Sequence, residues 1–302
     1  MSEIWRIDAL RPAAQRAAHV LSAVAAFLMA AASVVGVSVP GFYPDIPWAA
    51  EALRGGDLVN LLVGAPLLVA AMVVAARGSQ RARLVWAGAL GYTIYTYAYV
   101  VFGAEFNDLF LVHVAILSAA IWALICLLSA TDVPAVAASF GPRTPARTVS
   151  VLLGSTTVVL AGMWSYFSLR QALTGRLPGG AAPPAALHMV YATDLTFFVV
   201  PLGIATVLLW RRTAWGYVAG TVMAVMGASY LVNLMAAAAF QAHAHVPGVA
   251  AFSPVSLALD LAFVAAAAAM LATMTPRRRI TRPASESRLP PARETRNHAY
   301  GR

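Results

Sequence analysis

Residues 84–128 read LVWAGALGYTIYTYAYVVFGAEFNDLFLVHVAILSAAIWALICLL, and this stretch decides the fold. It holds two apolar segments, each long enough to span a membrane as a helix, separated by a short polar corner. Lipid offers no hydrogen-bond partner to a phenol or a hydroxyl, so polar groups on one helix face predict contact with protein or with a water-filled cavity. Small and hydroxyl-bearing residues recur at helical spacing in the first segment: Gly88, Tyr92, Tyr95, Thr96, Tyr99 and Gly103.

The composition indicates an integral membrane protein. Of the 302 residues, 60% are hydrophobic and 11% are charged, whereas a soluble domain has roughly 25% charged residues. We therefore predict an all-α membrane protein. Eight segments pass the length test for a transmembrane helix: residues 17–39, 58–76, 84–104, 109–130, 149–169, 190–210, 215–240 and 252–274.

The distribution of arginine predicts the orientation of these helices. If the N-terminus is cytoplasmic, 18 of the 21 arginines lie on the cytoplasmic side, and only Arg54, Arg170 and Arg176 lie outside. This asymmetry is what the positive-inside rule requires. Because the number of spans is even, both termini are predicted to be cytoplasmic.

Three parts of the chain are predicted. Residues 1–16 form a cytoplasmic N-terminal segment, residues 17–274 form the transmembrane domain, and residues 275–302 form a tail. The tail has eight arginines, two glutamates and four prolines without apolar periodicity, which predicts disorder. Its positive charge predicts attraction to anionic lipid headgroups. We expect no nucleic-acid partner, because the tail is short and has one tyrosine.

A weak internal repeat relates the second and sixth spans. Asp57-Leu is followed nine residues later by Pro66-Leu, and Asp194-Leu is followed seven residues later by Pro201-Leu. Each span leads through an arginine-bearing turn into a helix that begins near a tryptophan. We predict two parallel four-helix halves, residues 17–130 and 149–274.

Several of these segments resemble a group of uncharacterised bacterial multi-pass membrane proteins. The resemblance rests on Asp57–Asn60 with Pro66, on residues 91–97 and 106–111, and on the Asp194, Pro201 and Trp215 segments. It implies a location in the plasma membrane of a bacterium. The group has no assigned activity, so the resemblance implies no functional residue.

Four polar residues in or beside the spans are open to two interpretations. Asp260 lies about 12 Å into the last span, where a carboxylate is costly and is either functional or a neutral acid that bridges helices. His113 is either part of a proton relay or a satisfied structural imidazole. Asp194, early in the sixth span, is either a pocket residue or an acid that stabilises the N-terminus of the helix through the helix dipole. Asp57 directly precedes an apolar run and is predicted to be an N-cap.

Together these residues predict a polar pocket that opens toward the outer face. Tyr230 and Asn233 extend it from the seventh span, where they are also suited to bridging helices. The predicted members are Tyr92, Tyr95, Tyr99, Glu105, Asn107, His113, Asp194, Tyr230, Asn233 and Asp260. A metal site that joins His188, His243 and His245 is a weaker hypothesis, because a bare His-x-His pair is a poor metal motif.

The preferred function is a small-solute permease, proton-linked through Asp260 and His113. One alternative is a membrane-embedded enzyme that acts on a lipid or isoprenoid substrate. The other is a non-catalytic membrane sensor or assembly partner. The sequence singles out no cofactor and no particular small molecule or lipid.

Overall fold

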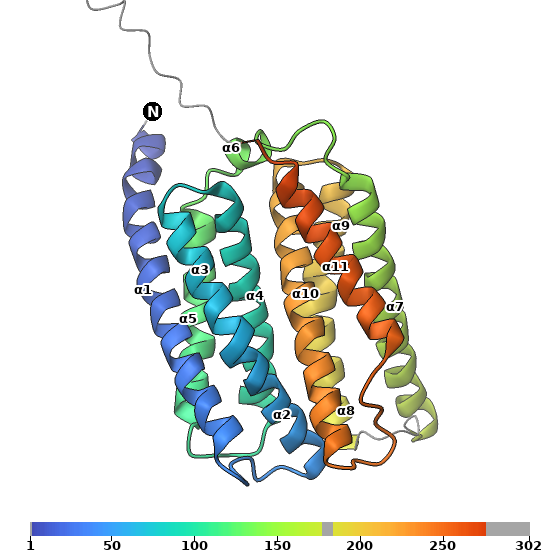
Figure 1. Ribbon diagram of the computed structural model, residues 1–302. Helices are drawn as coiled ribbons and strands as arrows, with labels where there is room; N and C mark the ends of the chain where they lie inside the picture. The colour runs from blue at the N-terminus through green and yellow to red at the C-terminus, as the bar shows by residue number, and fades with distance from the viewer. Residues whose placement is uncertain (1, 177–183, 276–302) are drawn as a thin grey trace, which may run out of the picture.

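The computed structural model describes residues 2–176 and 184–275, which fold into long helices packed side by side (Figure 1). The first four-span set comprises α1 (Ser2–Ser38), α2 (Pro47–Val59), η1 (Asn60–Gly64), α3 (Ala65–Ala76), α4 (Gln80–Gly103) and α5 (Phe110–Ser129). The short α6 (Val133–Ala137) follows. The second set comprises α7 (Ala146–Thr174), α8 (Pro184–Thr193), η2 (Asp194–Val199), α9 (Val200–Trp210), α10 (Ala214–His243) and α11 (Pro254–Ala272).

The structure confirms an all-α membrane protein. Within the described residues, eight helices are long and apolar enough to cross a membrane. The predicted start of the second span was wrong, because the helix begins at Pro47 and continues without interruption to Ala76. Asp57 is therefore not an N-cap but a buried residue ten positions inside the helix. Asp194 likewise lies ten positions after Pro184, the first residue of α8. Apart from Thr275, the basic tail lies outside the described residues.

Each of these two spans contains one π-helical turn, η1 or η2, which ends two residues before a proline. Proline has no N–H, and in a regular helix its ring clashes with the carbonyl four residues earlier. A wider turn avoids that clash. In both spans, the residue before the proline bonds the carbonyl five positions back: Ala65 N–H to Asn60 O, and Val200 N–H to Leu195 O. Such π-turns are frequent at functional sites.

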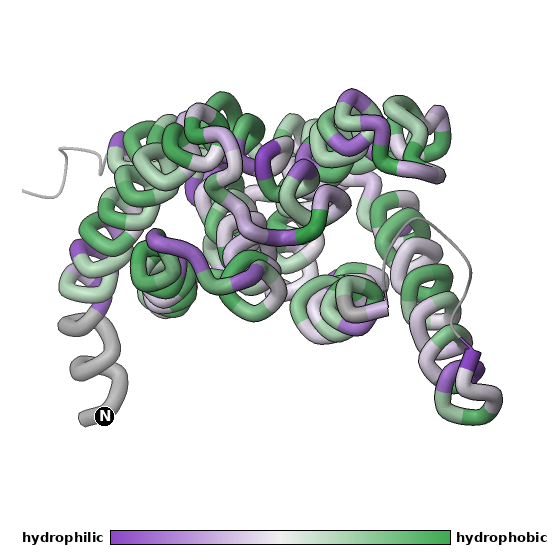
Figure 2. The backbone as a smooth tube through the Cα atoms, turned by 90° about the horizontal axis from the view of Figure 1, so that it is seen from below, coloured by the Kyte–Doolittle hydropathy of each residue, from purple (hydrophilic) through white to green (hydrophobic). Residues whose placement is uncertain are grey.

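The two sets of helices meet through α4 and α10, which pack against each other at the centre of the molecule. α2 of the first set packs on α10, and α8 of the second set packs on α4. α1 and α7 lie at opposite edges (Figures 1 and 2). Helices of both sets therefore pack on the central pair α4 and α10.

Glycine permits the closest helix contacts at this central interface. A Cβ atom on Gly55 of α2 would lie 2.7 Å from the carbonyl oxygen of Ala236 on α10. A Cβ atom on Gly88 of α4 would lie 2.6 Å from the side chain of Val225 on α10. Any larger side chain at either position separates the helices.

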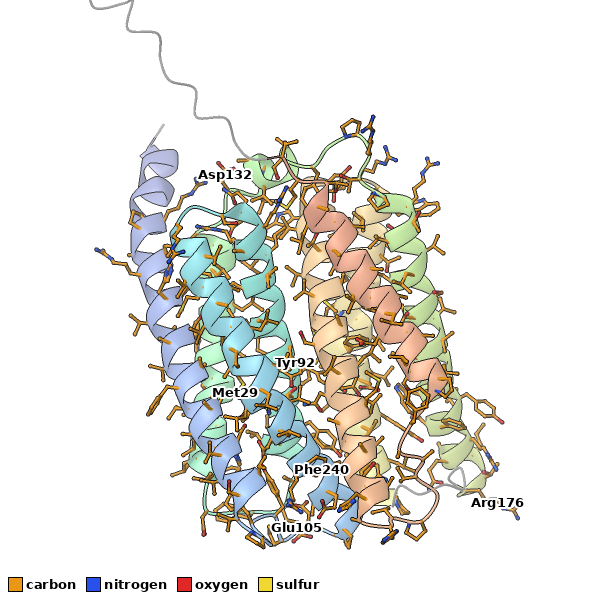
Figure 3. All side chains as sticks on the ribbon, in the orientation of Figure 1. Met29, Tyr92, Glu105, Asp132, Arg176 and Phe240 are labelled. Carbon is orange, nitrogen blue, oxygen red and sulfur yellow. The ribbon has the colours of Figure 1, made fainter. Side chains whose placement is uncertain are left out.

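The two ends of the molecule differ in the number of arginines that they carry. One end carries α6 and Asp132, and the opposite end carries Glu105 and Arg176 (Figure 3). At the α6 end, Arg83 donates hydrogen bonds to the Ala130 carbonyl at 3.4 Å and to Thr131 Oγ1 at 3.5 Å. The arginines of the loops and helix ends around α6 are Arg77, Arg81, Arg83, Arg143, Arg147, Arg211 and Arg212.

Candidate functional site

A cavity of about 420 Å³ lies between the two sets of helices. Its walls come from the parts of α2, α4, α7, α8, α10 and α11 that lie toward the end carrying Glu105 (Figure 3). Most of the wall is apolar, including Leu53, Leu160, Met163 and Leu234. The polar or aromatic lining residues are Trp48, Asp57, Asn60, Tyr95, Thr96, Tyr99, Thr156, Trp164, Asp194, Phe198, Tyr230, Asn233, Gln241, Ser256 and Phe263.

Asp194 supplies one of two carboxyl groups to this cavity. It is the first residue of η2 and is 4% exposed. Tyr95 of α4 donates its hydroxyl to Asp194 Oδ1, and Trp164 Nε1 of α7 donates to Oδ2 at 2.8 Å. Trp164 also stacks on Tyr191, with ring centroids 4.4 Å apart. Both donors line the cavity themselves, so the carboxyl group is held by the wall of the site.

Asp57 supplies the second carboxyl group. It lies three residues before Asn60, the first residue of η1. Ser33 Oγ of α1 donates to Oδ1 at 2.9 Å, and the Tyr43 hydroxyl donates to Oδ2 at 2.5 Å. Tyr43 lies in the loop between α1 and α2, where burial and the neighbouring Asp57 carboxylate raise its pKa. The phenol therefore keeps its proton and remains a donor. Both donors approach from behind the cavity wall, since neither lines it.

A short hydrogen-bond chain joins α2, α4 and α10 beside Asp57. Tyr92 donates its hydroxyl to Asn60 Oδ1 at 2.7 Å, and Asn233 Nδ2 donates to the Tyr92 oxygen at 2.8 Å. Asn233 Nδ2 also reaches the Gly56 carbonyl at 3.4 Å. Tyr92 is fully enclosed and lies at mid-depth in the molecule (Figure 3). The predicted tyrosine stripe thus links the two sets of helices.

Three aromatic rings lie together next to Asp194. The Tyr95 and Tyr230 rings meet edge to face with centroids 4.6 Å apart, and Phe198 lies 6.0 Å from Tyr95 and 5.7 Å from Tyr230. Among the described residues, the side chains that line the cavity include two carboxyl groups and no Arg or His. The cavity therefore combines aromatic surface with acidic groups that have no basic neighbour in the wall.

Two predicted pocket residues instead stabilise the corner before α5. The Glu105 side chain is exposed, and its backbone N–H donates to Asp45 Oδ1 at 3.0 Å. Burial and the neighbouring Glu105 charge raise the pKa of Asp45. Asn107 donates from Nδ2 to the Glu105 carbonyl at 3.2 Å and accepts from the Leu109 N–H at 3.1 Å. Neither residue contacts the cavity.

The predicted relay residues Asp260 and His113 also lie outside the cavity wall. His113 is buried on α5 against the ring of Tyr97, with centroids 5.9 Å apart. Asp260 is 6% exposed on α11, although its neighbours Leu259 and Phe263 do line the cavity. α5 and α11 belong to different sets of helices and lie on opposite sides of the central pair (Figure 1).

The three predicted metal ligands are exposed at the end carrying Glu105. His188 lies on α8, while His243 and His245 lie at and just beyond the end of α10. Within residues 2–176 and 184–275, no group of three His, Cys, Asp or Glu side chains is placed to hold a metal ion. The structure gives the metal hypothesis no support.

Asp260→Leu is expected to raise the thermal midpoint of the purified protein. Asp260 Oδ1 is buried and has no hydrogen-bond partner among the described residues, and such an atom costs about 1–3 kcal/mol. A melting curve in one detergent measures the effect, with the exposed Asp108→Leu as the control. A lower midpoint for Asp260→Leu alone would mean that the carboxyl group has a stabilising partner in the membrane.

Comparison with known proteins adds no residue to this site. No protein-family model, curated protein or solved structure matches this chain. The resemblance to uncharacterised bacterial membrane proteins therefore stays a prediction. The candidate site rests on its own geometry.

Several residues of the site escaped the sequence analysis. Asp57 was assigned to a cap because the apolar run after it is obvious, whereas Pro47, which opens the helix, stands ten residues earlier. Proline is common in the first turn of a helix, so Pro47 and Pro184 were available signals. Trp164, Ser33 and Tyr43 carry no local signal, because their partners are 30, 24 and 14 residues away, respectively.

Proposed function

We propose that this protein is a small-solute permease whose substrate binds in the central cavity. One observation carries the proposal. The cavity lies between the two sets of helices, and both of its carboxyl groups lie on spans that contain a π-turn. Secondary transporters bind their substrate at the interface between two groups of helices, and π-turns within helices are frequent at functional sites.

The volume of the cavity suits this role. Small-molecule sites usually enclose about 300–1,000 Å³ and combine an apolar wall with a few polar groups. The cavity has about 420 Å³ and that kind of wall. The proposal includes a proton link through Asp57 and Asp194, since these are the acidic side chains that contact the cavity.

We further infer that the α6 end faces the cytoplasm. Most of the described arginines gather there, as the positive-inside rule requires, and the cavity lies toward the opposite end. In a bacterium this orientation describes a plasma-membrane protein with an outward-facing cavity. A permease must also expose that cavity to the cytoplasm during its cycle.

Cysteine labelling tests the proposal without knowledge of the substrate. Thr96, in the cavity wall, is replaced by cysteine in a Cys126→Ser background. The membrane-impermeant trimethylammonium ethyl methanethiosulfonate is then applied to right-side-out and to inverted vesicles. Because a permease opens alternately to both sides, we expect modification of Thr96→Cys in both preparations.

Thr221→Cys in the same background is the control. Thr221 lies on α10 with 0% exposure and does not line the cavity, so it is expected to remain unmodified. Modification of Thr96→Cys from one side only would contradict a permease and favour a receptor or an enzyme. Modification from neither side would also contradict it.

A further inference from the structure

The chemistry of the cavity wall points to a class of substrate. Asp194 accepts two hydrogen bonds, from Tyr95 and Trp164, whereas a carboxylate has about four acceptor positions. Two positions therefore remain for a ligand. The lining residues provide no Arg or His to neutralise this group, so a cationic ligand gains from the carboxylate without displacing an ion pair.

The aromatic rings around Asp194 favour the same charge. Tyr95, Tyr230, Phe198 and Trp164 all line the cavity, and the first three are mutually in contact. The face of an aromatic ring attracts a cation through its quadrupole. An anionic ligand is disfavoured by both the rings and the carboxyl groups.

We propose that the cavity binds a small organic cation, an amine or quaternary ammonium with an apolar body, whose charged nitrogen lies against Asp194 and the Tyr95–Tyr230 rings. The apolar body of the ligand lies against Leu160, Met163 and Leu234 of the cavity wall. This assignment rests on the proposed function, since it names the substrate class of the same site. It requires no metal and no covalent chemistry.

Calorimetry with benzyltrimethylammonium tests the proposal on the full-length purified protein. We expect saturable binding of this probe. Phenylacetate, which has the same ring and the opposite charge, is expected not to bind. Equal or tighter binding of phenylacetate, or no detectable binding of benzyltrimethylammonium at millimolar concentration, would overturn the assignment.

Variants locate the cation. Asp194→Asn is expected to weaken binding of benzyltrimethylammonium by about tenfold or more. An amide at this position still accepts from Trp164 Nε1, while its NH₂ group donates to the Tyr95 oxygen, so the fold is retained. Asp108→Asn, at an exposed site on the end of the molecule, is the matched control and should bind like the natural protein. Unchanged binding in Asp194→Asn would contradict the proposal.

A second variant keeps the test decisive if Asp194→Asn does not fold. Tyr230→Leu removes one ring and keeps both carboxyl groups, and we expect it to weaken binding by about threefold or more. Failure of the permease is separately recognisable, because cysteine labelling reports access to the cavity from each side of the membrane and does not measure reversible binding. Labelling from both sides without cation binding refutes the substrate class alone, and cation binding with labelling from one side refutes the permease alone.

Discussion

Gly55→Leu is expected to lower the thermal midpoint of the purified protein by roughly 5 °C or more. A Cβ atom at this position would lie 2.7 Å from Ala236 O and 2.8 Å from Ala237 Cα, which are backbone atoms of α10. Backbone atoms in a packed helix cannot move aside as a side chain does. Overpacking of this kind costs about 1–3 kcal/mol or more, and leucine brings three further carbon atoms into the same contact.

Gly162→Ala provides the matched control for this experiment. Gly162 lies within α7, and a Cβ atom there would meet nothing within 4 Å. Removing a helical glycine at an open position is neutral or stabilises by about 0.5–1 kcal/mol. The two midpoints, measured by the same fluorescence-detected assay in one detergent, should move in opposite directions. Equal midpoints would mean that α2 and α10 are not in close contact in the membrane.

Asp57→Ala is expected to destabilise the protein by about 2–5 kcal/mol, because it leaves two buried hydroxyl groups without their acceptor. These are Ser33 Oγ and Tyr43 Oη, which approach the carboxyl group from α1 and from the loop after it. The substitution also removes the hydrogen bond by which Tyr43 ties the loop between α1 and α2 to α2. Denaturation of the purified variant, with the midpoint read at one detergent concentration, measures the cost.

Asp57→Asn separates the role of the hydrogen bonds from that of the charge. Asparagine accepts from one hydroxyl and donates to the other, whose proton is free to rotate, so we expect a loss of only about 1 kcal/mol. Asp108→Ala controls for removal of an exposed acid. If Asp57→Ala proved as stable as the natural protein, the carboxyl group would cost as much to bury as its hydrogen bonds return.

The number and positions of the membrane helices follow from the sequence alone. Apolar length is a local property, and it located each of the eight spans found among the described residues. The stripe that contains Tyr92, Tyr95 and Tyr99 was also predictable, because helical periodicity puts these side chains on one face. Tyr95 and Tyr99 do line the cavity, and Tyr92 lies directly behind Asn60 and Asn233.

The misplaced start of the second span shows where local patterns fail. The residues before Asp57 include Glu51, Arg54 and two glycines, which read as a polar loop. They form a helix because α10 covers its glycine face. That stabilisation comes from another helix more than 170 residues away in the chain.

Which acidic residue belongs to the site was decided by tertiary structure alone. Asp57, Asp194 and Asp260 are all acids in apolar surroundings, and sequence ranked Asp260 first. Asp260 follows Leu259 on α11, and successive side chains of an α-helix point about 100° apart. Leu259 therefore faces the cavity while Asp260 does not. Asp57 and Asp194 reach the cavity because α2 and α8 cross the central pair α4 and α10 from the two sets of helices. Hydropathy measures how much a segment prefers lipid, whereas side-chain partners depend on how helices pack, and only the folded chain determines that.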